Sequence, residues 1–97
     1  MPDVDTSVLK PVFEREYRRI KREVIRNIRK YELNIAELTV KMGERMTAKA
    51  RARNPKTREV IQRDIDVIQT LIDEHRAAIT REHDRLENFE RATGVYV

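Results

Sequence analysis

Hydrophobic residues recur every three or four positions through the first half of the chain. At about 100° per residue, ten of them share one arc of roughly 80°, which is typical of an amphipathic helix. Their mean spacing is nearer about 3.67 than 3.5 residues, so we expect this stripe to supercoil weakly or not at all. The first stripe comprises Phe13, Tyr17, Ile20, Val24, Ile28, Tyr31, Ile35, Leu38, Met42 and Met46.

A second stripe begins at Ile61 and keeps a seven-residue period, the spacing of a coiled-coil seam. Two of its members, His75 and Glu82, are polar. They could pair with each other, face a polar gap or ligate a metal ion. We expect the pair, because buried polar groups can fix the register of two helices. The second stripe comprises Ile61, Ile65, Ile68, Ile72, His75, Ile79, Glu82, Leu86 and Phe89.

One short interruption separates the two stripes. Asn54 is a favourable N-cap and Pro55 suits the first position of a helix, so the pair can end one helix and begin the next. No alternation typical of a strand occurs. The sequence therefore predicts one all-α domain spanning 1–97, a long antiparallel, coiled-coil-like helical hairpin. Its expected parts are a helix at about 8–53, a turn at about 53–56 and a helix at about 55–93.

Start and stop signals lie at the outer ends of both helices. The first helix should begin between Asp5 and Pro11, because proline is tolerated only near the first turn. Gly94 can take the left-handed conformation that commonly ends a helix, and residues 95–97 would then form a small apolar tail. Gly43 leaves an alternative open: if it ends the first helix early, the chain has three helices.

The two stripes do not include all of the large apolar side chains. Three more lie along one line beside the second stripe, and Ala78 continues that line. Three others lie off the first stripe, towards its back. Large aliphatic side chains left in water forfeit about 1.5–3 kcal/mol each, so we expect self-association, most simply a dimer that forms a four-helix bundle, or a higher oligomer. The expected interface consists of Ile25, Leu33, Val40, Val60, Val67 and Leu71.

The net charge of +4 hides an asymmetry. Residues 1–58 carry 16 Lys/Arg and 8 Asp/Glu, a net of +8, whereas residues 59–97 carry 5 and 9, a net of -4. Seven cations project within about 120° opposite the first stripe, and no acid shares that arc. Such a face could contact a phosphate backbone, an acidic protein surface or only solvent. We define this basic face as Arg15, Arg18, Arg19, Arg22, Arg26, Arg29 and Lys30.

More cations surround the expected turn. Lys49 and Arg53 rotate onto the angle of the first stripe, where a partner helix ordinarily requires hydrophobic residues. We therefore expect the stripe to end near Met46 and the two helices to splay apart beyond it. The resulting cationic tip consists of Lys49, Arg51, Arg53, Lys56 and Arg58.

Few kinds of chemistry are compatible with this composition. The chain has no cysteine, which excludes disulfides, thiolate metal sites and cysteine nucleophiles. Because no Glu-x-x-His motif, phosphate-binding glycine loop or nucleophile elbow occurs, we expect no catalytic, cofactor or metal site and no small-molecule substrate. Arg63–Ile79 resembles the opening helix of all-helical chorismate mutases, which would imply an enzyme that binds a small dianion. That resemblance covers under a fifth of the chain and leaves about twenty residues for two further helices.

These patterns predict a non-enzymatic structural or assembly protein, a self-associating hairpin whose basic face docks on a partner protein. The alternative is a protein that binds nucleic acid without sequence preference through the basic face and the tip, because helix-turn-helix spacing and exposed aromatic residues are both absent. No run approaches the ~18 apolar residues that a membrane span requires. We expect a soluble, cytoplasmic protein, or one held inside an assembled particle such as a virion.

Overall fold

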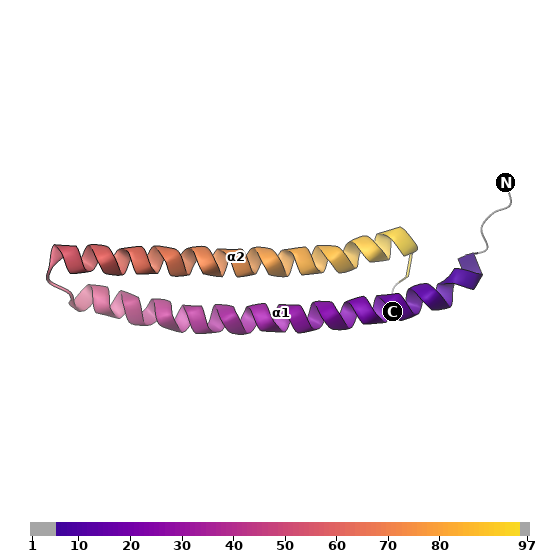
Figure 1. Cartoon of the computed structure of the whole chain (residues 1–97), viewed down its shortest axis with the longest axis horizontal. Coiled ribbons are helices and arrows are strands. Elements are labelled where there is room, and N and C mark those ends of the chain that lie inside the picture. The colour runs from indigo at the N-terminus through magenta and orange to yellow at the C-terminus, as the bar shows by residue number, and fades with distance from the viewer. Residues whose placement is uncertain (1–5, 96–97) are drawn as a thin grey trace.

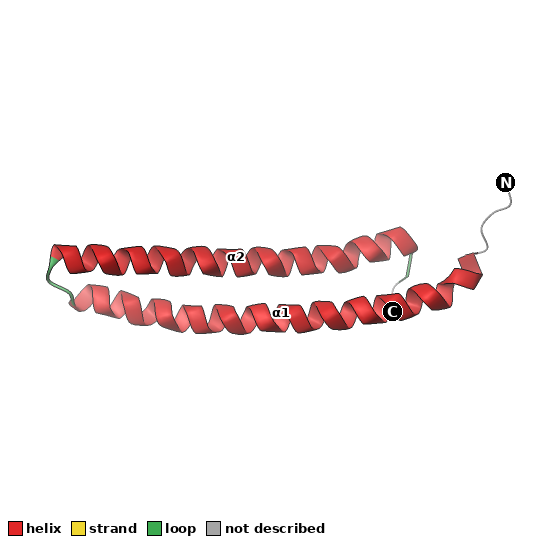
Figure 2. Cartoon of the chain, in the orientation of Figure 1, coloured by secondary structure: helices red, strands yellow, loops and turns green. Residues whose placement is uncertain are grey.

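The chain folds into two long antiparallel helices joined by a short turn. The structure is a computed structural model that describes residues 6–95. Helix α1 spans Thr6–Arg51 and helix α2 spans Pro55–Thr93, and they lie side by side (Figure 1). Figure 2 shows no strand in this part of the chain, which is helical except at the turn and after α2. The predicted all-α hairpin is confirmed.

The hairpin is a rod one helix thick. Its extents are 76 × 23 × 12 Å, and the shortest of these is close to the diameter of a single helix. Each helix therefore covers only one side of the other. The N-terminal turns of α1 extend past the end of α2 (Figure 1).

The core lies between the two predicted stripes, and its buried side chains are distributed along the hairpin. Its buried side chains include Tyr17, Ile20 and Val24 from α1. From α2 they include Ile61, Ile65, Ile72 and Ala78. Most other members of both stripes are half-buried, because no third layer covers them. Met46 is 52% exposed, at the position where we expected the first stripe to end.

Two expectations about individual core positions are wrong. Ala78 is only 7% exposed, so it belongs to the core and not to the outer line of α2. His75 and Glu82 form no hydrogen bond with each other. The His75 ring instead lies 5.8 Å from the Tyr31 ring. Glu82 Oε2 is buried without a hydrogen bond, and Arg85 Nη1 lies 3.9 Å from it.

The turn has the predicted chemistry. Asn54 adopts an extended conformation, and its side-chain Oδ1 accepts a 2.9 Å hydrogen bond from the Lys56 amide. Pro55 then opens α2 as expected. Helix α1 ends at Arg51, two residues before the predicted boundary, and it runs through Gly43 without a break. The three-helix alternative is therefore wrong.

The predicted splaying of the two helices near the turn is also wrong. Lys49 lies half-buried against α2, and its Nζ donates a hydrogen bond to Gln62 Oε1. Ala48 and Ala52 are half-buried as well. A lysine can lie on this seam because its aliphatic stem covers apolar surface while its charged end reaches a polar partner.

Gly94 ends α2 as predicted. Its φ of 69° is left-handed, and its amide donates a 2.7 Å hydrogen bond to the Glu90 carbonyl. Val95 then lies buried. Tyr96 and Val97, the rest of the expected tail, lie outside the described residues, as does Asp5, the earliest start expected for the first helix.

Candidate interaction surfaces

A chain of ion pairs crosses one side of the hairpin near its open end. Arg19 Nε donates a 3.1 Å hydrogen bond to Glu16 Oε2, and Arg19 Nη1 lies 2.6 Å from Glu23 Oε1. Glu23 Oε2 in turn accepts a 2.6 Å hydrogen bond from Arg85 Nη2, on the other helix. Two carboxylates and two guanidinium groups therefore alternate from α1 to α2.

These contacts shift the proton affinities of the groups. The hydrogen bond from Arg19 lowers the pKa of Glu16 below its usual 4.5. The hydrogen bond from Arg85 is the largest cause of the lowered pKa of Glu23, with the charge of Arg19 adding to it. Bonding to Glu16 raises the pKa of Arg19. Both carboxylates are therefore ionised at neutral pH, and both are bound by guanidinium groups, those of Arg19 and Arg85.

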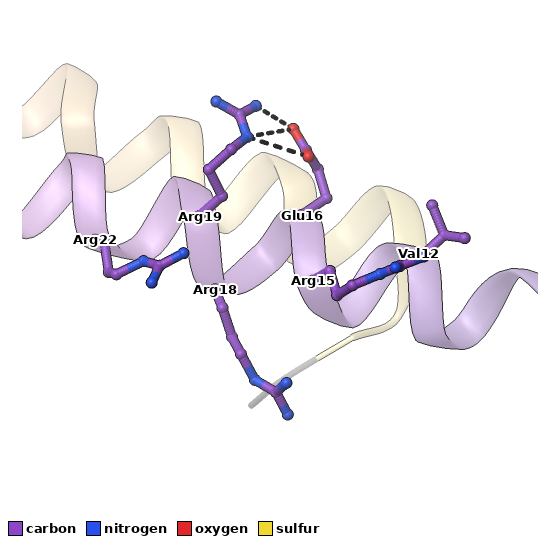
Figure 3. Close-up of a pocket in the computed structure, with 6 residues that line it drawn as sticks. All are labelled: Val12, Arg15, Glu16, Arg18, Arg19 and Arg22. Carbon is purple, nitrogen blue, oxygen red and sulfur yellow. Dashed lines mark hydrogen bonds and ion pairs between the residues drawn. The ribbon is translucent and has the colours of Figure 1, made fainter.

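Arg19 consequently differs from the rest of the basic face. The other six members are exposed and form no ion pair with any described residue. Figure 3 shows Arg19 turned towards Glu16, while Arg18 and Arg22 point away from that pair. We call the six unpaired residues the cationic ridge: Arg15, Arg18, Arg22, Arg26, Arg29 and Lys30.

The cationic tip divides in the same way. Lys49 is occupied by its hydrogen bond to Gln62. The other four tip residues are exposed, and none forms an ion pair with a described residue. These four are Arg51, Arg53, Lys56 and Arg58.

A third surface runs along the tip half of α2. Three shallow depressions adjoin one another there, since Arg45 and Asp64 line two of them and Val67 lines two. Arg45 Nη1 lies 3.8 Å from Asp64 Oδ2 across the helices. We define the side stripe as Val60, Val67 and Leu71, which line these depressions and are 56%, 58% and 38% exposed.

The other half of the expected interface lies elsewhere. Ile25, Leu33 and Val40 are exposed on α1. At 100° per residue, Leu33 and Val40 lie on the outer face of α1, opposite the buried Val24, and Ile25 lies on the side away from Arg45. The structure therefore brings only the three α2 residues into one line.

Sequence reasoning missed the contacts between the helices, chiefly Glu23–Arg85 and Arg45–Asp64. Arg19 follows Glu16 by three residues and precedes Glu23 by four, and these two spacings could have revealed the part of the network within α1. Arg85 gives no such local signal, because its pairing depends on the register between the helices.

The described part of the chain contains no candidate metal cluster and no candidate membrane span. Among residues 6–95, no three side chains of the His, Cys, Asp or Glu types lie close enough together to hold a metal ion. Neither helix, over the same residues, contains a segment long and apolar enough to cross a bilayer.

Comparison of the chain with protein-family models, with curated proteins and with solved structures gives no match. A functional assignment therefore depends on the three surfaces themselves, the cationic ridge, the cationic tip and the side stripe.

Proposed function

We propose that this chain is a non-enzymatic structural or assembly element that pairs with a second copy of itself through the side stripe. The supporting observation is the run of adjoining depressions in which Val60, Val67 and Leu71 remain exposed. Exposed apolar side chains that gather along adjoining depressions are typical of a protein interface, whereas scattered ones need no explanation.

The thinness of the hairpin favours this proposal. Two helices bury one stripe each, and a chain of this size gains stability by adding a further layer. Each large aliphatic side chain that moves from water into an interface contributes about 1.5–3 kcal/mol. In a two-fold dimer, both copies bury the same side-stripe residues. Association of two hairpins into four helices is therefore the simplest closed arrangement.

Paired variants test the proposal. Val67→Glu with Leu71→Glu should convert the dimer to a monomer, because carboxylates would be buried in the interface without partners. Leu33→Glu with Val40→Glu makes the matched control, since both residues are exposed on the outer face of α1. Sedimentation velocity at micromolar concentration measures the mass of each.

Two results would contradict the proposal. A wild-type monomer across the micromolar range would remove self-association altogether. A dimer that persists in the Val67/Leu71 variant but dissociates in the Leu33/Val40 variant would move the interface to the outer face of α1.

A further inference from the structure

We propose that the cationic ridge binds the phosphate backbone of double-stranded nucleic acid without reading its sequence. This inference goes beyond self-association and involves a different face of the hairpin. The ridge lies on the outer side of α1, so pairing through the side stripe of α2 leaves it accessible.

The length and spacing of the ridge suit a phosphate backbone. From Arg15 to Lys30 the helix rises about 22 Å at 1.5 Å per residue. Arg18, Arg22, Arg26 and Lys30 follow one another at i, i+4 steps of about 6 Å. A duplex presents one negative charge per about 1.7 Å of its axis, so a 22 Å segment offers more phosphates than the ridge has cations. Each of the six side chains can therefore have its own phosphate.

The neighbouring acids do not neutralise the ridge. Glu16 and Glu23 flank it, but Arg19 and Arg85 occupy their carboxylates. The ridge cations consequently face one another without opposite charges, and each i, i+4 pair of like charges is unfavourable by a few tenths of a kcal/mol. Phosphates bound along the ridge would relieve this repulsion.

A nucleic-acid partner fits this face better than an acidic protein does. The centre of a protein–protein interface is depleted in charged residues and depends on buried apolar or aromatic anchors. Between Arg15 and Lys30 the ridge contains no aromatic residue, and the one exposed aliphatic residue there, Ile25, lies at its edge. Val12 and Leu33 lie beyond its ends. Surfaces that contact nucleic acid are, by contrast, much more positively charged.

The aromatic residues favour a duplex over a single strand. Binding to single strands depends on exposed rings on which bases stack. Tyr17 is buried in the core, and half-buried Tyr31 lies against the His75 ring. The ridge itself offers only guanidinium and ammonium groups, which hold phosphates in place but do not by themselves identify a sequence.

Salt dependence provides the first test. A fluorescein-labelled DNA duplex of about 20 base pairs and mixed sequence is titrated with the full chain, and binding is followed by anisotropy. With six phosphate contacts, the logarithm of the affinity should fall with the logarithm of the salt concentration at a slope near -5. This slope corresponds to about a 10³-fold loss between 50 and 200 mM salt. A second duplex of unrelated sequence should bind within about threefold of the first.

A matched pair of double variants locates the site. Arg22→Gln with Arg26→Gln should weaken binding roughly 10- to 100-fold and lower the magnitude of the salt slope by about two. Lys10→Gln with Arg81→Gln removes the same charge from two other exposed cations that have no ion pair with a described residue, and should weaken binding less than about threefold. Circular dichroism and sedimentation confirm that both variants keep their helicity and mass.

Three results would overturn the inference. The first is an absence of duplex binding at 50 mM salt, and the second is an equal loss of binding in both double variants. The third is tighter binding to poly-glutamate than to the duplex at the same salt, which would assign the ridge to an acidic polypeptide. None of these results depends on whether the chain dimerises.

Discussion

The Tyr17 hydroxyl donates a 2.7 Å hydrogen bond to Glu90 Oε1, which joins residues 73 positions apart. The Tyr17 ring also lies 6.2 Å from the Phe89 ring, and Lys21 Nζ lies 5.9 Å from its centroid. This contact connects α1 and α2 near the open end of the hairpin, far from the turn that joins them in the chain. It therefore helps to fix the register at the end that the backbone leaves unconnected.

Removing this hydroxyl should destabilise the hairpin. Tyr17→Phe deletes a partly buried hydrogen bond to a carboxylate, and we expect the free energy of unfolding to fall by about 1.5–3 kcal/mol. Tyr31→Phe is the control, because the Tyr31 hydroxyl has no hydrogen bond to a described residue, and it should change stability by less than about 0.5 kcal/mol. Urea unfolding at one protein concentration measures both, and equal losses would contradict the assigned role of Tyr17.

The two glycines should respond to alanine in opposite directions. Gly94→Ala places a side chain in a left-handed residue and should destabilise the protein by about 1 kcal/mol. Gly43 lies inside α1, and a Cβ added there would have nothing within 4 Å. Gly43→Ala should therefore stabilise the helix by about 0.5–1 kcal/mol. Thermal unfolding followed by circular dichroism measures both variants. Changes of the same sign would show that one of these backbone assignments is wrong.

The ion-pair network predicts how stability responds to acid. Glu16 and Glu23 have a lower pKa in the folded state than their usual 4.5. The stability that the ionised forms of Glu16 and Glu23 contribute is therefore fully present above pH 4.5 and is lost as the pH falls through their folded-state pKa. Arg19→Gln should raise the pKa of Glu16 towards 4.5 but that of Glu23 less, because Arg85 still binds Glu23. Carboxyl NMR shifts recorded against pH measure both, and equal changes would contradict this division.

Replacing Glu82 with an apolar residue should make the folded hairpin more stable. Its Oε2 is buried without a hydrogen bond, and Arg85 retains Glu23 as a partner when Glu82 is removed. An apolar side chain avoids this desolvation cost, so Glu82→Leu should raise the free energy of unfolding by about 1 kcal/mol. For a domain of this size the unfolding midpoint should then rise by about 4–8 °C. A lower midpoint would show that the carboxylate stabilises the seam in spite of its missing hydrogen bond.

Local patterns were sufficient to predict the hairpin. The spacing of the two stripes fixes which face of each helix is buried, and Asn54-Pro55 defines the break, because both signals act over a few neighbouring residues. The ends were less accurate, as the end of α1 at Arg51 shows. Helix termini depend on small differences in capping free energy, which resist assignment from sequence.

Relations between the helices could not be predicted in the same way. Ala78 was grouped with Val67 and Leu71 by its angle on a straight helix. Residues 71 and 78 are seven apart and share one heptad position, so the periodicity of α2 alone does not distinguish the exposed Leu71 from the buried Ala78. Lys49 was expected to force the helices apart, but its flexible stem lies along the seam and its amino group bonds to Gln62. Both errors arise where the outcome depends on the neighbouring helix.

The open end and the turn lie at opposite ends of the rod, which is up to 76 Å long (Figure 1). Whatever anchors the N-terminal end of α1 and the C-terminal end of α2 therefore holds the cationic tip at a set distance, so the hairpin can act as a molecular ruler. Seven residues added to each helix at matched positions would lengthen it by about 10 Å while keeping every face nearly in phase. The reach of the tip can thus change in evolution independently of the surfaces along the rod.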